Sequence, residues 1–192
     1  MGTERARTPT TSPLDHGAVA LLVTGSPGAG KSTVARAVAG ALSRSALVNG
    51  DAVARLVVGG YVWPLGEPAD EAARQVRLCN DNLCSLARNL LAAGFTPVID
   101  WIVPDGDQLE VYRAALGERL RVVVLDPGAD VCVARDRQRA PLEQFAFDGH
   151  DALRATMVEG FGGRGWWLDS SHLTAQETAA LVLREADERA RA

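Results

Sequence analysis

The feature that most constrains this chain is a glycine-rich turn that carries its one lysine. Residues Gly25 to Ser32 read G-S-P-G-A-G-K-S and match the phosphate-binding pattern G-x-x-x-x-G-K-[ST] in full. Such a turn needs a strand before it and a helix after it, because main-chain N–H groups must converge on an anion. Residues 18–24 read as a buried strand, and residues 32–42 place apolar side chains at helical spacing. The order predicts a site for nucleotide phosphates.

The residue types in the turn define the chemistry expected there. A lysine ammonium is compact and sits on a flexible stem, so Lys31 can follow the β- and γ-phosphates during transfer. The Ser32 hydroxyl is the expected Mg²⁺ ligand, with Thr33 as the less favoured substitute. The alternative, a glycine turn that only starts a helix, fits the complete pattern and its preceding strand less well. The predicted cofactors are ATP and Mg²⁺, and the predicted nucleotide-binding residues of the turn are Gly25, Ser26, Gly28, Ala29, Gly30, Lys31, Ser32 and Thr33.

Composition restricts the classes of protein to which the chain can belong. Its 192 residues are 47% hydrophobic, enough for a sizeable core, and we expect one domain over residues 18–192. Residues 1–17 lack an apolar run and are expected to form a disordered tail. The net charge of −4 argues against a dedicated nucleic-acid binder, and no apolar run approaches membrane-spanning length. Three cysteines without C-x-x-C spacing or a secretion signal are expected to be reduced thiols, which favours the cytoplasm.

Apolar runs that read as strands alternate with segments of helical periodicity. The expected strands are 18–24, 46–49, 95–103, 120–125 and 166–169, and the later helical patterns are 71–93, 107–116, 129–138 and 175–189. The last helix follows a T-x-x-E capping box from Thr174 to Glu177. This alternation predicts an α/β protein with a mainly parallel sheet between two helical layers. Ligands of such sheets bind at the carboxyl ends of the strands, where the sequence places Gly25, Asp51, Asp100, Asp126 and Asp169.

Two of these aspartates are candidates for phosphoryl-transfer chemistry. Asp51 follows the second strand in V-N-G-D and is the first choice for the group that accepts the proton of a substrate hydroxyl. The alternative is that Asp51 only N-caps a helix over residues 52–57. Asp100 ends the apolar strand P-V-I-D, where a carboxylate can help to hold Mg²⁺ or face the acceptor. A structural Asp100 is the alternative, and the two aspartates could also exchange roles.

A run of arginines precedes a stretch that resembles a lid. Arg135 and Arg139 lie one helical turn apart, just before the turn-rich residues 140–150. We expect a lid over about 139–155, in which Arg139 neutralises charge on the transferring phosphoryl group and water is excluded. A solvated charged helix face is the alternative.

Residues 51–80 are expected to enclose the acceptor. Tyr61 and Trp63 lie in a glycine-rich segment that suits a mobile loop, and Arg77 and Asn80 lie along the flank of the helix over 71–93. Packing or a solvent-facing position is the alternative for each of these side chains.

With these motifs the chain resembles the small P-loop kinases, a group that includes adenylate, shikimate, gluconate and adenylylsulfate kinases and chloramphenicol phosphotransferase. The resemblance rests on G-S-P-G-A-G-K-S-T, on N-G-D and V-I-D at strand ends, on R-x-x-x-R, and on L-D-S-S-H-L-T near the end. It implies a three-layer α/β/α P-loop NTPase fold with a five-stranded parallel sheet in the order 2-3-1-4-5. It also implies that Asp51 is the acceptor-site aspartate, and that Arg135 lies near the adenine and Arg139 near the phosphates. Residues 169–172 would border the adenine.

The resulting functional prediction is an ATP-dependent kinase that phosphorylates a hydroxyl of a small molecule, with antibiotic or nucleoside-like compounds as the favoured acceptors. The chain shows no D-x-D pair as in shikimate kinase and no pattern that would identify a nucleoside monophosphate, so the motifs define the donor better than the acceptor. A polynucleotide-end kinase is an alternative that the acidic balance disfavours. A non-enzymatic ATP-binding regulator is another, whereas one lysine leaves no room for the guanine-reading N-K-x-D of a GTPase switch.

Overall fold

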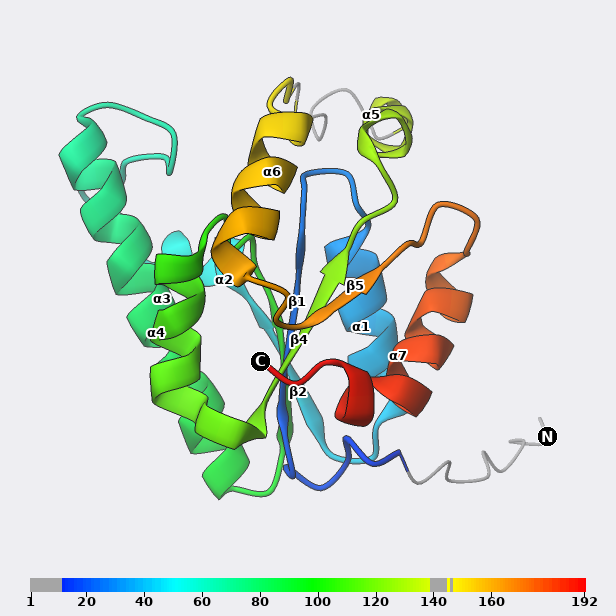
Figure 1. Ribbon diagram of the computed structural model, residues 1–192. Coiled ribbons are helices and arrows are strands. Elements are labelled where there is room, and N and C mark those ends of the chain that lie inside the picture. Colours follow the sequence, from blue (N-terminus) through cyan, green and yellow to red (C-terminus); the bar gives the residue numbers. More distant parts are fainter. Residues whose placement is uncertain (1–11, 139–144, 146) are drawn as a thin grey trace, which may run out of the picture.

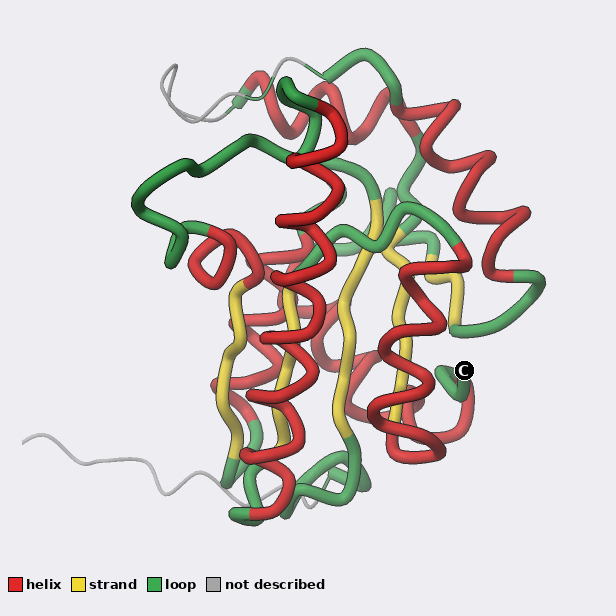
Figure 2. Tube along the Cα trace, turned by 90° about the vertical axis from the view of Figure 1, so that its left-hand side faces the viewer, coloured by secondary structure: helices red, strands yellow, loops and turns green. Residues whose placement is uncertain are grey.

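The computed structural model describes residues 12–138, 145 and 147–192, and it contains a five-stranded parallel sheet. The strand order is β2-β3-β1-β4-β5, which confirms the predicted 2-3-1-4-5 order and the α/β class. Figure 2 looks onto one helix-covered face of this sheet, with the strands lying side by side behind the helices. The strands are β1 (Ala20–Gly25), β2 (Ser45–Asn49), β3 (Thr96–Asp100), β4 (Leu120–Leu125) and β5 (Trp166–Leu168).

Helices cover both faces of the sheet and make it the middle of three layers (Figure 1). Alternate side chains of β1 enter two separate cores, because successive side chains of a strand point to opposite faces. Leu21 and Val23 pack with α1 (Lys31–Ala41) and α7 (Ala175–Arg189). Ala20 and Leu22 pack in the other core, which is formed with α3 (Ala69–Ala92), α4 (Gly106–Leu116) and α6 (His150–Phe161). The shorter elements are α2 (Gly50–Ala54), the 3-10 helix η1 (Gly117–Arg119) and α5 (Ala129–Arg137).

The observed elements differ from the expected ones in three places. The third strand ends at Asp100, and the helix expected over 52–57 is the shorter α2, which Asn49 caps by accepting the N–H of Ala52. Helix α6 was not predicted, because it follows a turn-rich stretch and has no side-chain cap at its start. The predicted capping box of Thr174 and Glu177 is present at the start of α7. Within the described ranges, no helix combines the length and apolar character required to cross a membrane.

The segment just before β1 is packed against the domain, which corrects the expectation of a tail up to residue 17. Leu14 is fully buried, and the Ser12 hydroxyl donates to the carbonyl oxygen of Leu183 in α7. The Asp15 carboxylate accepts the N–H groups of Ser43 and Arg44, which follow α1. One buried apolar side chain and the hydrogen bonds of Ser12 and Asp15 therefore fix this segment, and none of these residues belongs to a periodic pattern. Residues 1–11 lie outside the described residues.

The Asp15 anchor makes a testable contribution to stability. Burial raises the pKa of its carboxyl, but hydrogen bonds from Ser43 and neighbouring amides outweigh burial and lower this pKa from 3.8 to about 2. The charged form is therefore stabilised by folding. The charged Asp15 carboxylate contributes about 2 kcal/mol to the free energy of unfolding above pH 4, and this contribution is lost as the pH falls towards 2.

We expect Asp15→Asn to lower the free energy of unfolding at pH 7 by about this amount and to flatten its decline between pH 4 and 2. Urea denaturation over a pH series measures both effects. Glu188→Gln, at an exposed position of α7, is the matched carboxyl-to-amide control. Equal unfolding curves for the two variants would contradict the assigned role of Asp15.

Candidate active site

The glycine-rich turn lies between β1 and α1 and is pressed against two neighbouring elements. At Gly25, φ is 138°, and a Cβ atom would lie 2.4 Å from the carbonyl oxygen of Leu125 at the end of β4. At Gly28, φ is 78°, and a Cβ atom would lie 2.3 Å from the carbonyl oxygen of Cys132 in α5. Both positions combine a backbone conformation that favours glycine with contacts that leave no room for a side chain. The path of the turn thus depends on these two residues.

The N-terminus of α1 is available to an anion. Its N-cap residue is Gly30, which supplies no side-chain cap, and its first turn has no acidic residue. The first amides of a helix lack intrahelical partners, and the helix dipole favours negative charge there. Lys31 begins the helix and its Nζ donates to the carbonyl oxygen of Ser26, 2.9 Å away, so the ammonium lies over the turn. These features are those of a phosphate site.

Arg135 connects the turn with the segment expected to border the adenine. From α5, one terminal nitrogen donates to the carbonyl oxygen of Ala29 at 3.1 Å, and the other donates to the carbonyl oxygen of Ser170 at 2.8 Å. The structure thus places this predicted nucleotide-binding residue beside the turn. Arg139, predicted to act on the phosphates, lies outside the described residues, as does most of the predicted lid before residue 147.

The carboxyl ends of β2 and β3 bring Asn49 and Asp100 together. Asn49 Nδ2 donates to Asp100 Oδ2 at 2.9 Å, and the Asp100 residue is only 5% exposed. The parallel register pairs Asp100 with Val23, two residues before Gly25, so this carboxylate lies next to the start of the turn. A buried carboxylate is costly unless donors or a cation compensate its charge, and the Asn49 amide supplies one donor.

Asp51 is the second residue of α2, and its side chain is exposed at the same edge of the sheet. Because Asn49 caps this helix, the alternative role of Asp51 as the N-cap is wrong. Gly50, just before it, packs on the Trp101 ring, so closely that a Cβ atom would lie 2.1 Å from the ring. This contact holds the start of α2, and with it Asp51, against the segment that follows β3.

The protein oxygens near the turn fit Mg²⁺ bound together with a nucleotide. Ser32 and Thr33 are exposed at the start of α1, and the Asp100 carboxylate lies at the adjacent strand end. In residues 12–138, 145 and 147–192 no group of three or more His, Cys, Asp or Glu side chains is arranged to hold a metal ion. Nucleotide-dependent enzymes usually hold Mg²⁺ with one or two protein oxygens, substrate phosphates and water, so a complete protein cage is not required.

The predicted acceptor-side residues do not form one group. Tyr61 and Trp63 are partly exposed on the loop between α2 and α3. Asn80 is fully buried, and its side chain donates to Gln108 and accepts the Tyr112 hydroxyl. Both polar atoms take part in a hydrogen-bond network between α3 and α4, which favours the alternative of a packing role for Asn80.

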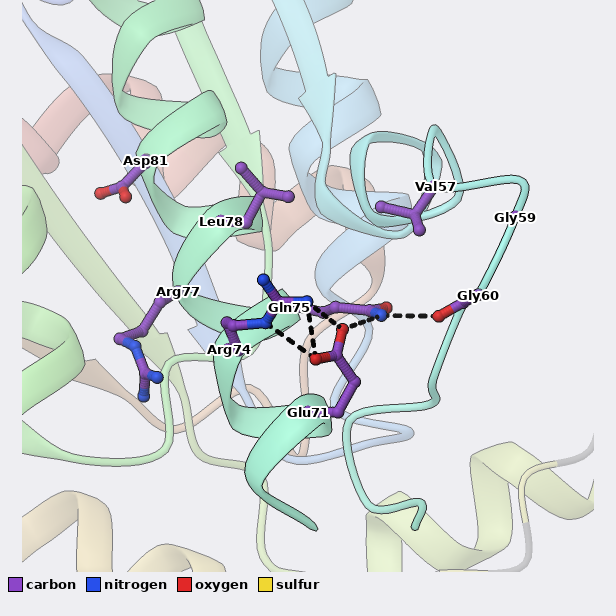
Figure 3. Close-up of a pocket in the computed structure, with 9 residues that line it drawn as sticks. All are labelled: Val57, Gly59, Gly60, Glu71, Arg74, Gln75, Arg77, Leu78 and Asp81. Atoms are coloured by element: carbon purple, nitrogen blue, oxygen red, sulfur yellow. Dashed lines mark hydrogen bonds and ion pairs between the residues drawn. The ribbon is translucent and has the colours of Figure 1, made fainter. Parts of the chain in front are cut away.

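A cavity of about 570 Å³ lies between this loop and α3 (Figure 3). Val57, Gly59 and Gly60 line its loop side, whereas Glu71, Gln75 and Leu78 line its helix side. Of the residues predicted to contact the acceptor, Arg77 alone is among the described residues that line this cavity. The volume lies within the range of about 300–1,000 Å³ typical of small-molecule sites.

Helix α6 brings residues to the turn that the sequence patterns did not identify. Arg154 donates through Nε to both carboxylate oxygens of Asp126, at 2.9 Å each, and this hydrogen bond raises the pKa of Arg154. His150 and Arg154 line a small hollow with Ser26 and Asp126. Asp126 was expected at this sheet edge, but its partner depends on a helix that the periodicity did not reveal.

A row of aromatic side chains connects the acceptor-side loop with the start of α6. The ring centroids of Trp63 and Phe145 are 5.5 Å apart, those of Phe145 and Phe147 are 5.8 Å apart, and those of Phe147 and His150 are 4.9 Å apart. Aromatic pairs at these separations attract each other beyond their burial of apolar surface. The loop that carries Trp63 is therefore in contact with residues of the predicted lid.

The sequence matches one known protein family, and the fold is similar to those of several solved structures. The family model described as AAA domain matches residues 21–163, from β1 to just past the end of α6. No curated protein matches the chain. A sugar kinase from Janibacter sp. HTCC2649 has a similar structure, with a TM-score of 0.62 and 19% identity over 86% of this chain and 92% of that chain.

Two further structures share the fold. Shikimate kinase from Acinetobacter baumannii, in complex with shikimate, has a TM-score of 0.59 and 19% identity, over 86% of this chain and 91% of that chain. The tunicamycin resistance protein of Deinococcus radiodurans has a TM-score of 0.56 and 17% identity, over 85% of this chain and 93% of that chain. With the sheet order and the glycine-rich turn, these matches show that the chain belongs to the AAA domain family and has the fold of the small P-loop kinases.

Proposed function

We propose that this protein transfers the γ-phosphoryl group of Mg·ATP to a hydroxyl of a small molecule. The observation that carries the proposal is the uncapped N-terminus of α1 beneath a glycine turn, with Lys31 over the turn and Arg135 beside it. Two carboxylates, Asp51 and Asp100, lie at the same edge of the sheet. Phosphoryl transfer requires this combination of anion binding, positive charge and an acidic group near the acceptor.

On the donor side, the main-chain amides of the turn and of α1 bind the phosphates. Lys31 exchanges the Ser26 carbonyl oxygen for a phosphate oxygen and stabilises the charge that develops during transfer. The Ser32 hydroxyl and the Asp100 carboxylate would hold Mg²⁺, which when bound neutralises charge on the β- and γ-phosphates. Arg135 and residues 169–172 would flank the adenine, with residues 139–155 as the lid.

On the acceptor side, Asp51 accepts the proton of the attacking hydroxyl. The hydroxyl oxygen forms a bond to the γ-phosphorus while the bond between this phosphorus and its oxygen bridge to ADP breaks. The solvent-facing position of Asp51 supports this role, because its carboxylate is not used as the helix cap. Residues 51–80 enclose the acceptor in this scheme.

Antibiotic or nucleoside-like compounds remain the proposed acceptors, and the similarity to a tunicamycin resistance protein is compatible with the former. The proposed compartment is the cytoplasm, a proposal supported by three cysteines that are all free and buried. The test is incubation with Mg·ATP and a panel of hydroxylated compounds, followed by mass spectrometry. We expect ADP and a monophosphorylated product. Nucleotide binding without transfer to any compound would instead favour a non-enzymatic regulator.

Replacement of Lys31 tests the donor half. We expect Lys31→Ala to lower kcat by about 10²–10³-fold, because it removes a preorganised cation from the transferring phosphoryl group. An assay of ADP release measures the change. Arg36→Ala, an exposed cation of the same helix, serves as the control and should retain activity. Turnover of Lys31→Ala within a few-fold of the original protein would refute this role.

Replacement of Asp51 tests the acceptor half. We expect Asp51→Asn to bind ATP with unchanged affinity and to lose nearly all acceptor phosphorylation, because the amide cannot accept the hydroxyl proton. Calorimetry with a non-hydrolysable ATP analogue and the transfer assay separate the two effects. Near-normal turnover would remove Asp51 from the mechanism.

Replacement of Asp100 tests the metal site. We expect Asp100→Asn to raise the Mg²⁺ concentration that gives half-maximal activity, because a neutral amide is a weaker ligand than a carboxylate. A titration of activity against Mg²⁺ at fixed ATP measures this change. If the titration curve is unchanged, Asp100 has a structural role.

A further inference from the structure

Exposed apolar side chains gather on the loop beside the 570 Å³ cavity. Eight large apolar residues are exposed in the described part of the chain, and five of them lie within residues 56–65: Leu56, Val58, Tyr61, Trp63 and Leu65. A sixth, Leu78 of α3, is 47% exposed and lines the cavity itself. Of these six side chains, only Leu78 lines the cavity, and the other five lie on the loop that borders it. A concentration of exposed apolar side chains, unlike scattered ones, is typical of binding surfaces.

The walls of this cavity are held in place by Gln75. Its Nε2 donates to the carbonyl oxygen of Gly60 at 2.7 Å, and its Oε1 accepts the N–H of Val62 at 2.9 Å. These two bonds flank Tyr61. Gln75 also donates to Glu71 at 2.7 Å, and Figure 3 shows this bond together with the one to Gly60. The loop therefore keeps its shape while its apolar side chains face solvent, which is the arrangement of a site formed in advance of its ligand.

The charges around the cavity balance. The cavity is lined by two arginines, Arg74 and Arg77, and by two acids, Glu71 and Asp81. Arg74 forms an ion pair with Glu71 at 2.8 Å. Recognition of a phosphate or carboxylate requires an excess of cationic or N–H donors directed at it. A cavity with equal numbers of both signs provides no such excess, so its chemistry favours an uncharged ligand.

We propose that this cavity takes an uncharged, amphiphilic hydroxyl compound, whose apolar part lies against Leu78 and Val57 and whose polar part meets the charged rim. This inference rests on the proposed kinase function, in which the compound would be the acceptor. Cys79, next to the cavity-lining Leu78, donates to the carbonyl oxygen of Gly50, so the cavity and Asp51 lie on the same pair of packed helices. A carbohydrate or nucleoside joined to an apolar chain or ring has the required character. Such an acceptor differs from the small anionic substrates that a strongly basic pocket would select.

The test is calorimetric binding of alkyl β-D-glucopyranosides, from methyl to octyl, below their critical micelle concentrations and without nucleotide. We expect affinity to increase by about fourfold for each added methylene until the apolar wall is covered. Hexyl β-D-glucuronide, which adds one carboxylate, should bind no more tightly than hexyl β-D-glucopyranoside. Affinity that is independent of chain length, or tighter binding of the glucuronide, would overturn the proposal.

Two variants of α3 provide the matched comparison. Leu78→Ser should reduce the dependence on chain length, whereas Leu86→Ser should retain it, because Leu86 is similarly exposed at 41% but does not line the cavity. Equal slopes in both variants would overturn the assignment. Light scattering of the original protein and of Leu78→Ser provides a further test. A dimer that dissociates in Leu78→Ser would show a surface between copies of the chain and would likewise overturn the proposal.

Calorimetric uptake of Mg·ATP is measured on the same samples. Its absence would contradict the proposed kinase function and leave the glucoside result intact, so the two failures can be told apart.

Discussion

The site depends on the close approach of the backbone at Gly25 and Gly28 to the carbonyl oxygens of β4 and α5. A Cβ atom at either position would overlap those oxygens, so the turn can take this path only with glycine. The path in turn leaves the first amides of α1 without protein caps. Arg135 lies on α5, the helix that packs against Gly28. One helix therefore both contacts the turn and places a positive charge beside it. The glycine turn, α1 and α5 are therefore packed into one unit, and this unit is the donor half of the proposed kinase.

Those parts of the fold that depend on local patterns could be predicted from the sequence. The glycine turn, the alternation of strands with helices and the capping box of Thr174 and Glu177 each need only residues close together in the chain. The sheet order came from the resemblance to a known fold, and the structure has the same order. Asp100 could be placed next to the turn because carboxyl ends of neighbouring parallel strands meet at one edge.

The remaining features are tertiary, and no local pattern encodes them. Asn80 lies on the α3 flank in the sequence, but the Tyr112 hydroxyl and the Gln108 side chain make it part of the interior. The cap of α2 is Asn49 rather than Asp51, a difference that depends on where β2 ends. Helix α6 and the pair of Arg154 with Asp126 escaped prediction because the helix follows a stretch without periodicity.

The aromatic row from Trp63 to His150 joins the loop between α2 and α3 to the start of α6. The row ends at His150, which lines a small hollow together with Ser26 of the glycine turn. A ligand that displaced the Trp63 ring would therefore act on a chain of ring contacts that extends to the turn. Thermodynamic linkage is reciprocal, so any coupling through these rings would act with equal strength in both directions.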